Sequence, residues 1–386
     1  MLFWLHLAAG VAAGGVILAM SVTGVALAYQ RQLTEWSVGR QMPAAGGARL
    51  PLDTLAARAL AAAPAGSRLT GVTVRSEPRA PVAVAVEAKG PGAGRRTFWV
   101  DPSTGTVLPG SPRLQAFFGG AERLHRSLMI GRGTRSPQGA AVTGAANLAF
   151  FFLLLSGLYL WVPRRWTRRA VRAVALPAPG ARGRARDWNW HHVMGLWAGP
   201  GLAAVVGSAA FLSYRWPERL VARAAGVPAR VERPEGAGRE SGRAGTPPDA
   251  AAAPRASFDT LAARALAGAA AGWYSVQLRP SAPDARPEVT ATLSTARTLR
   301  PDRRVTVTLD PSTGLVRKRQ GYADLDAGRR ARGWARFVHT GEAFGVIGQT
   351  AALLVSLAGA GLVWTGLALA LRRLGRAVAA RRAPAT

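Results

Sequence analysis

The chain has 386 residues, with 50 Lys and Arg against 20 Asp and Glu, and no cysteine, so its formal net charge at pH 7 is +30. Without cysteine there is no disulfide scaffold, thiolate metal site, iron–sulfur cluster or cysteine nucleophile. The positive charge first suggests nucleic acid or an anionic membrane as partner. However, 49% of the residues are hydrophobic, and they gather in long uncharged runs. We therefore expect a lipid bilayer and no nucleic acid.

Four apolar stretches are long enough for a membrane-spanning helix, which needs about 20 residues. In chain order, the predicted transmembrane helices cover residues 1–30, 138–163, 190–215 and 343–371. The first stretch could instead be a cleaved signal peptide, because Ala26-Leu27-Ala28 resembles a cleavage site. Its long apolar run and the lack of preceding basic residues favour an uncleaved anchor.

Arginine in the short connecting segments predicts the orientation of these helices. The segment 164–187 contains eight arginines and one acid, and the tail 372–386 contains five arginines and no acid. Basic segments stay on the cytoplasmic side of a membrane, so both are predicted to be cytoplasmic, as are both termini. The two long segments between the helix pairs then lie on the periplasmic side of a bacterial inner membrane.

The two long segments contain related sequences, which indicates an internal duplication. Asp53-Thr54-Leu55-Ala56-Ala57-Arg58 returns as Asp259-Thr260-Leu261-Ala262-Ala263-Arg264, and the turn sequence Asp101-Pro102-Ser103-Thr104-Gly105 returns as Asp310-Pro311-Ser312-Thr313-Gly314. Each copy predicts one helix followed by antiparallel strands, because alternating runs such as 82–86 precede the turn. We predict two small α+β modules, at 48–112 and 256–320, with a Gly- and Pro-rich linker at 226–255.

Histidine is the residue that the pattern singles out for chemistry. His6 and His191 begin the first and third helices in a shared His-xxx-Gly-xxx-Gly pattern, and His125 and His339 come shortly before the second and fourth. Two imidazoles from different helices at one depth can bind a haem iron on both sides. His192 lies about 100° around the helix from His191, so we place it beside the site. An interfacial, non-ligating role remains the alternative for each histidine.

Glycine recurs at four-residue spacing after two of these histidines. Gly10, Gly14, Gly195 and Gly199 lie on one side of their helices. Small residues there allow the close approach of a flat macrocycle or of a neighbouring helix. The sequence does not distinguish between these two uses.

The order of these motifs resembles the PepSY-associated transmembrane proteins. The resemblance covers about residues 1–372 and includes LHRSL before the second helix, SGLYLWVPRR at its end, and NWHHVMGLWAG and FVHTGEAFGVIGQ in the second half. It implies an α-helical membrane protein with four transmembrane helices and two periplasmic PepSY modules. The family includes iron-regulated inner-membrane proteins and ferric-siderophore reductases. For the reductases, the resemblance also implies b-type haem, with the histidines at the borders of the helices as iron ligands: His6, His125, His191 and His339.

These observations predict haem-dependent electron transfer from the cytoplasmic side to periplasmic ferric iron or a ferric siderophore, through two haems. His6 would pair with His191, and His125 with His339. No flavin or nicotinamide motif occurs, so the electron donor would be a quinone or a cytoplasmic reductase. The alternative is a non-enzymatic protein whose PepSY modules bind a peptide, a protease or a cell-wall component. A transporter is the third possibility, but the spans contain no acidic residue that would bind a cation.

Overall fold

The structure is a computed structural model. It describes residues 1–43, 47–88, 94–131, 136–163, 166–226, 256–268, 272–282, 287–297 and 300–382. The predicted linker 226–255 lies outside the described residues apart from Gly226, as do the last four residues of the predicted tail. Two compact units form, and each is described by itself. The helical unit comprises Met1–Gln30, Arg113–Pro217 and Arg332–Thr386, and the sheet unit comprises Arg31–Pro112 and Glu218–Ala331.

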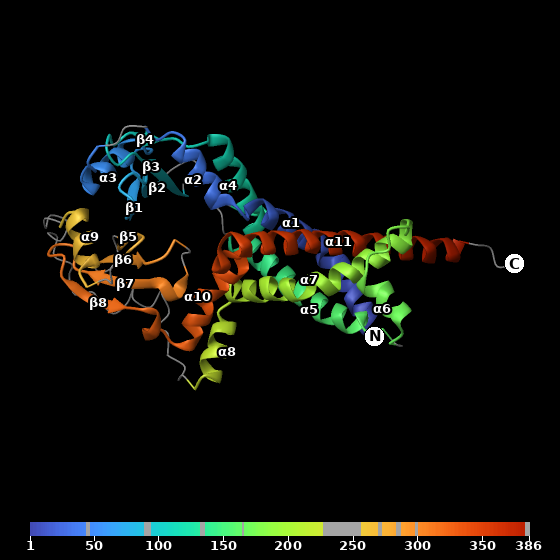
Figure 1. Ribbon diagram of the computed structural model, residues 1–386. Helices are drawn as coiled ribbons and strands as arrows, with labels where there is room; N and C mark the ends of the chain where they lie inside the picture. Colours follow the sequence, from blue (N-terminus) through green and yellow to red (C-terminus); the bar gives the residue numbers. More distant parts are fainter. Residues whose placement is uncertain are drawn as a thin grey trace. The chain divides into compact units, whose positions relative to one another are not determined.

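Four long helices form the helical unit (Figure 1): α1 (Leu2–Leu27), α5 (Pro137–Trp161), α7 (Gly183–Ser213) and α11 (Gly345–Arg382). Helix α1 packs against α5 and α11, and α7 packs against the same two helices. This arrangement is a four-helix bundle. Its buried apolar centre is formed by Leu154, Ala198, Leu202, Val206 and Leu362.

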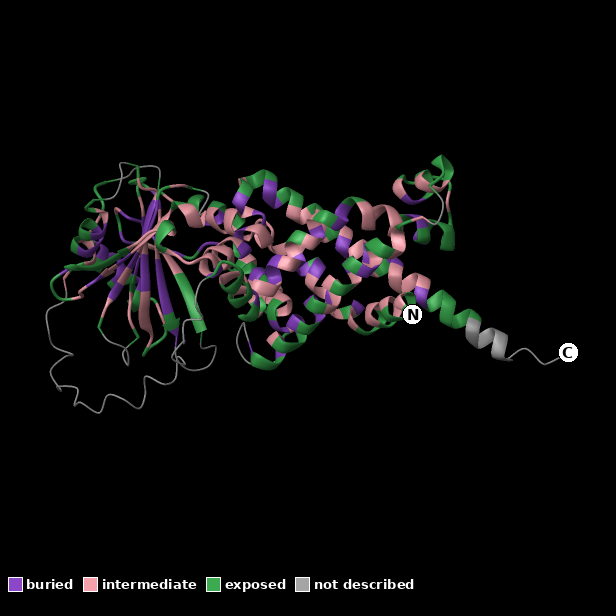
Figure 2. Ribbon diagram, turned by 90° about the horizontal axis from the view of Figure 1, so that it is seen from below, coloured by how far each residue is buried: buried purple, intermediate pink, exposed green. Residues whose placement is uncertain are grey.

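All four bundle helices are long and apolar enough to cross a membrane. The candidate spans are Leu2–Gly39, Pro137–Trp161, Gly183–Ser213 and Glu342–Arg376. Many of their large apolar side chains are exposed, and Figure 2 shows exposed and intermediate residues mixed with buried ones along the helices. Leu155 and Leu357, for example, are 53% and 55% exposed. Such side chains suit contact with lipid, and the protein is a membrane protein with four candidate spanning helices.

The predicted helix ends differ from the observed ones on the side rich in arginine. Helix α7 begins at Gly183, seven residues before the predicted start, and α11 continues through the arginines to Arg382. A short helix, α6 (Arg168–Ala175), also lies inside the predicted loop 164–187. Arginine is a good helix former, so a helix continues past the point where its sequence stops being apolar. The segment 164–187 therefore contains helix α6 and the first residues of α7.

Several further helical segments are short. They are α2 (Gln30–Gly39), α4 (Pro112–Ser127), α8 (Trp216–Ala224), α10 (Ala327–Thr340) and the 3-10 turns η2 (Pro301–Arg303), η3 (Tyr322–Asp324) and η4 (Glu342–Phe344). Helices α4 and α10 matter most for the site, because they carry His125 and His339 in their last turns.

The sheet unit contains one antiparallel sheet of eight strands in the order β4-β3-β2-β1-β5-β6-β7-β8. The strands are β1 (Arg68–Arg75), β2 (Val82–Ala88), β3 (Gly94–Val100), β4 (Val107–Leu108), β5 (Ser275–Pro280), β6 (Val289–Ser294), β7 (Arg304–Leu309) and β8 (Val316–Gln320). Helix α3 (Leu52–Ala61) precedes the first four strands and α9 (Phe258–Leu266) precedes the last four. Both helices contribute to one continuous buried core with the strands.

The two α+β segments share this sheet and do not form separate modules. Strands β1 and β5 pair antiparallel from Val72 with Leu278 to Arg75 with Ser275. Strand β1 was not predicted, because its sequence mixes polar and apolar residues around Gly71. The predicted turns occur in both segments: Gly105 and Gly314 have φ of 71° and 70°, and Asp101 and Asp310 each accept hydrogen bonds from the backbone two and three residues on.

A reciprocal pair of caps joins helices α3 and α9. The backbone N–H of Leu52, at the start of α3, donates to Asp259 on α9 over 2.6 Å. The N–H of Phe258, at the start of α9, donates to Asp53 on α3 over 2.8 Å. Each aspartate therefore satisfies a free amide at the start of the other helix. This contact explains why both copies of the repeated DTLAARAL sequence begin with Asp.

Asp53→Ala is expected to loosen α9, and Asp259→Ala to loosen α3, each by about 1 kcal/mol, because each removes the cap of the opposite helix. Hydrogen exchange of the intact protein in detergent, read by mass spectrometry, checks this. Faster exchange should appear at Phe258 in the first variant and at Leu52 in the second. Glu77→Ala, at an exposed loop residue, is the control. Faster exchange confined to the substituted helix itself would contradict the reciprocal capping.

Candidate functional site

Two of the predicted histidines line a single cavity in the helical unit. His6 on α1 and His191 on α7 border a cavity of about 430 Å³ between the bundle helices. Most of the lining is apolar, and it includes Phe150, Leu153, Leu154, Leu158, Leu362 and Leu367. Cavities of about 300–1,000 Å³ with an apolar lining and few polar groups are typical of small-molecule and cofactor sites.

Hydrogen bonds fix the tautomer of both rings. His6 Nδ1 lies 2.8 Å from the Ser156 hydroxyl, and His191 Nδ1 lies 3.0 Å from the Thr365 hydroxyl. Each hydroxyl donates its own proton to a carbonyl one turn back in its helix, at 2.7 Å in both cases. With the hydroxyl protons directed at these carbonyls, the hydroxyl oxygens can accept from the imidazoles, and this arrangement puts the ring proton on Nδ1. The lone pair is then on Nε2, the form in which a neutral histidine binds a metal.

Glycines give the two rings their space. A Cβ on Gly157 would lie 3.3 Å from Cε1 of His6, and a Cβ on Gly366 would lie 3.3 Å from Cε1 of His191. Of the four glycines at four-residue spacing, for which a macrocycle and helix packing were both open, Gly10, Gly14 and Gly195 line the cavity. The fourth, Gly199, faces Leu158, 3.6 Å from where its Cβ would be, and so serves helix packing.

The other two predicted histidines meet as a second pair. The ring centres of His125 and His339 are 6.1 Å apart, with an angle of 55° between the ring planes. His125 Nδ1 donates to the carbonyl of Met20, at 3.0 Å, and His339 Nδ1 donates to the carbonyl of Val205, at 2.9 Å. A carbonyl can only accept, so these rings also carry the proton on Nδ1. The lone pair of each is again on Nε2.

Left-handed backbone segments hold the second pair in place. Leu128 and Met129, directly after α4, have φ of 52° and 58°, and Gly341, directly after α10, has φ of 73°. Residues with a side chain rarely adopt positive φ. These reversals end α4 and α10 before the spans begin, so that the last turn of each packs against α1 or α7. The sequence placed these histidines near the spans but did not predict that they lie on separate helices.

Burial keeps the second pair uncharged. It lowers the pKa of His125 to about 4, with a further contribution from nearby His339. Burial also lowers the pKa of His339. Both rings are therefore neutral near pH 7, which a metal ligand requires.

A matched pair of glycines allows the α4–α5 and α10–α11 contacts. A Cβ on Gly139 would collide with the backbone of Ser127, and a Cβ on Gly348 would collide with that of Gly341.

Gly139→Ala is expected to destabilise the helical unit by about 1–3 kcal/mol, because the backbone must move to admit the methyl group. Thermal unfolding in detergent measures the change. Gly15→Ala is the control, since no atom lies within 4 Å of its Cβ position; equal melting temperatures would contradict the prediction.

His192 is distinct from its neighbour. It lines the same cavity as His191, but its ring lies against Trp188 of its own helix, with ring centres 4.1 Å apart. Its Nδ1 donates to the Trp188 carbonyl over 2.8 Å. His191 instead contacts Thr365 and Gly366 on α11. The structure therefore places His192 beside the pair, as the helical angle predicts.

Each pair presents two metal-binding nitrogens from different helices. The ring centres of His125 and His339 are 6.1 Å apart, which is close enough for both rings to hold one metal ion at bond lengths of about 2 Å. Within the described residues, no three His, Asp or Glu side chains come together as a metal-binding group. Two imidazoles leave a metal ion with open positions, which another molecule would have to fill.

The hydroxyl partners of the first pair were not predicted. Ser156 and Thr365 are each followed by glycine, in SGLYL and TGLAL, at matching positions of the second and fourth spans. Aligning these two short sequences would have identified both hydroxyls and both glycines. The carbonyl partners of the second pair leave no trace in the sequence, because every residue has a carbonyl.

Comparison with known families matches residues 3–373 to the family described as the PepSY-associated TM region. The match includes all five histidines. None of the curated proteins matches the chain.

Proposed function

The chain belongs to the PepSY-associated TM family, and from that premise we propose that it transfers electrons across a bacterial inner membrane. Electrons would enter at the cytoplasmic side, from a quinone or a cytoplasmic reductase, and would reach ferric iron or a ferric siderophore in the periplasm. Haem b would be held at two sites, by His6 with His191 and by His125 with His339. The purpose would be iron acquisition.

One observation carries this proposal: in all four histidines, which form two pairs from different helices, Nδ1 lies within hydrogen-bond distance of an oxygen on a bundle helix, so that Nε2 is left for a metal. The residues fit haem because histidine is a common protein ligand of haem iron, and each pair would hold one haem through two imidazoles. The cavity at the first pair suits a flat apolar group, because glycines line it and its other side chains are mostly apolar. Bound haem would supply a reversible one-electron carrier.

The protein's own residues would orient this group and keep it dry. Ser156 and Thr365 fix the rings of the first pair, and the carbonyls of Met20 and Val205 fix those of the second. Leu154, Leu362 and Phe150 exclude water from the first site. A dry, apolar surrounding controls solvent access and thereby the redox potential of a metal centre.

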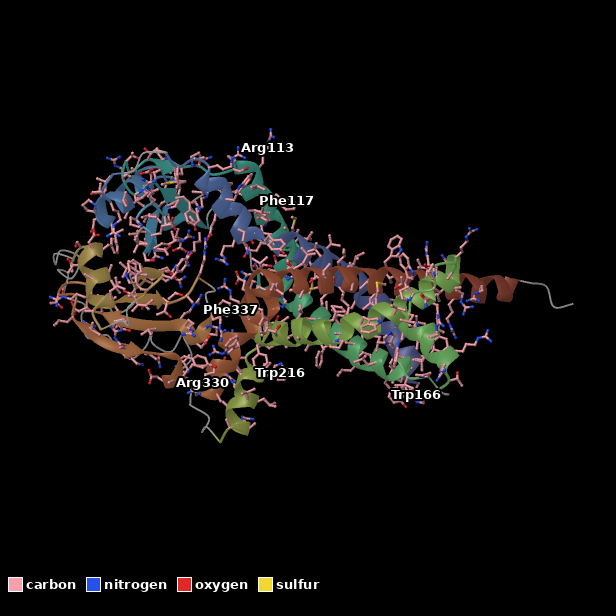
Figure 3. The ribbon with its side chains drawn as sticks, in the orientation of Figure 1. Arg113, Phe117, Trp166, Trp216, Arg330 and Phe337 are labelled. Carbon is pink, nitrogen blue, oxygen red and sulfur yellow. The ribbon has the colours of Figure 1, made fainter. Side chains whose placement is uncertain are left out.

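The distribution of charge and of aromatic residues supports the proposed orientation. Helix α6 contains Arg168, Arg169 and Arg172, and basic segments remain cytoplasmic. Trp166 lies toward one end of the bundle, and Phe117 and Trp216 lie toward the other (Figure 3); they are 69%, 56% and 50% exposed. Exposed aromatic side chains are enriched at both membrane interfaces. The first pair would then be near the cytoplasmic face and the second near the periplasmic face, with the sheet unit as two fused periplasmic PepSY modules.

Matched contacts in the two halves support an origin by duplication. Met20 relates to His6 as Val205 relates to His191, fourteen residues along the helix in both cases, and both provide the carbonyl that holds a second-pair histidine. Ser156 and Thr365 have the same role for the first pair, because each contacts Nδ1 of one histidine and each is followed by glycine. Two unrelated helix pairs would not be expected to share these details.

The proposed chemistry on the substrate is a one-electron reduction. Fe(III) accepts one electron and becomes Fe(II), which has a lower charge and binds hard oxygen ligands less strongly. A siderophore with oxygen ligands would then release the ion for uptake.

Proteoliposomes test this function. Dithionite is enclosed in the vesicles, and ferric citrate with a colorimetric Fe(II) chelator is added outside. Vesicles with the wild-type protein should form Fe(II) outside faster than protein-free vesicles, and the rate should fall to the protein-free level in His6→Ala/His339→Ala. Equal rates for the wild-type protein and this double variant would overturn the proposal.

A further inference from the structure

The cavity of the first pair has a cationic rim. Arg184 on α7 and Arg373 and Arg376 on α11 are among its lining residues, and the lining includes no Asp or Glu. All three arginine side chains are exposed. A ligand that fits this cavity would therefore have an apolar body and one or more anionic groups at its edge.

Neighbouring arginines have a carboxylate partner, and these three do not. Asp187, only 1% exposed, pairs with Arg186 at 2.8 Å and with Arg372 at 3.0 Å. Throughout the part of the chain that the structure describes, no ion pair occurs for Arg184, Arg373 or Arg376. The carboxylate of Asp187 is thus paired with two arginines that do not line the cavity. The charges of the arginines that do line the cavity remain available to an anionic ligand.

Aromatic side chains position one of these arginines. The Arg373 guanidinium lies 4.7 Å from the ring centre of Trp4 and 5.0 Å from that of Phe3. Phe3 also lines the cavity. A guanidinium held by stacking on aromatic rings keeps its N–H groups available at its edge, where they can bind a carboxylate through two parallel hydrogen bonds.

We propose that Arg184 and Arg373 bind the carboxylates of the ligand that occupies the cavity. This rests on the proposed function, in which that ligand is haem b and the carboxylates are its two propionates. The arginines then determine which edge of the macrocycle faces the arginine-rich end of the bundle. They are positioning residues, since they contact the rim of the ligand and not the metal.

Reconstitution with two macrocycles tests the proposal. Apo-protein from haem-depleted cells is titrated with haem b and with its dimethyl ester, in which both carboxylates are neutral. Binding is followed by absorbance, separately for the wild type, Arg184→Gln/Arg373→Gln and the control Arg172→Gln on α6. The variant Arg184→Lys/Arg373→Lys keeps both positive charges. It serves as a control that distinguishes loss of charge from misfolding in the glutamine double variant.

The wild type and Arg172→Gln should bind haem b roughly tenfold more tightly than the ester at the first site. The glutamine double variant should bind both macrocycles with the affinity that the wild type has for the ester, and the lysine variant should fall between. Equal loss of affinity for haem b and the ester in the double variant would overturn the proposal. So would an anionic phospholipid that copurifies with the wild type and is lost from the double variant while haem binding is unchanged. Absence of binding by either macrocycle to the wild type would instead refute the proposed function.

Discussion

His339→Ala is expected to halve the haem content of the purified protein, from two per chain to one. His339 is the only second-pair ligand on α10, and its ring faces that of His125 at 6.1 Å. Its removal leaves His125 as the one imidazole at that site, and a single axial ligand holds haem much less strongly than two. The first pair, which is built from other residues, should keep its haem. The pyridine haemochrome spectrum and the protein concentration give the ratio.

His192→Ala is the matched control for that experiment. His192 lines the first cavity but lies against Trp188 and is set apart from the pair. Both haems should remain in this variant, while His191→Ala should lose the first one only. Equal haem content in His339→Ala and His192→Ala would show that the pairing is wrong.

Thr365→Val is expected to weaken haem binding at the first site about 10- to 100-fold, which is typical for the loss of a partner that orients a metal ligand. Valine has nearly the shape of threonine but cannot accept the Nδ1–H of His191. The buried ring nitrogen then loses its hydroxyl acceptor and keeps only the weaker contact with the Leu362 carbonyl, and the imidazole becomes a weaker electron donor. The affinity of the first site for ferric haem should fall more than its affinity for ferrous haem, so the midpoint potential of the first haem should rise. Potentiometric titration followed by absorbance measures both effects.

Two control variants test whether the effect of Thr365→Val comes from the loss of the Thr365 hydroxyl. Thr365→Ser keeps the hydroxyl and should restore affinity and potential. Ser21→Ala removes a buried hydroxyl of α1 and should leave both unchanged. The second haem should not respond, because its histidines donate to backbone carbonyls. A shift in the second haem alone, or no shift at all, would argue against the proposed role of Thr365.

The four spans and the four paired histidines were predictable because they depend on residue type and on repetition. An uncharged run of about 20 residues has few alternatives to a membrane helix, and a histidine repeated in both halves is visible directly. The helix ends were less predictable, because α7 already includes Arg184 and Arg186 before its apolar part begins. Strand β1 was missed because Gly71 and its polar neighbours weaken the alternation on which strand prediction depends.

The relation between the two α+β segments required the structure. Each segment alone predicts a helix and antiparallel strands, but the pairing of β1 with β5 joins residues about 200 positions apart. The reciprocal caps of Asp53 and Asp259 are also long-range contacts. Within one copy, such an Asp is explained equally well by the dipole of its own helix. Only the two copies together show that each Asp caps the other helix.

The central claim is that two histidine pairs bind haem, and one measurement tests it most directly. The wild-type protein is expressed in haem-replete cells, purified in mild detergent, and examined by visible absorption before and after dithionite is added. The account predicts a Soret band that shifts on reduction, sharp α and β bands, and two haem b per chain. A protein that is folded but has no Soret band would contradict the account, and binding of a peptide, a protease or a cell-wall component by the sheet unit would then be the remaining hypothesis.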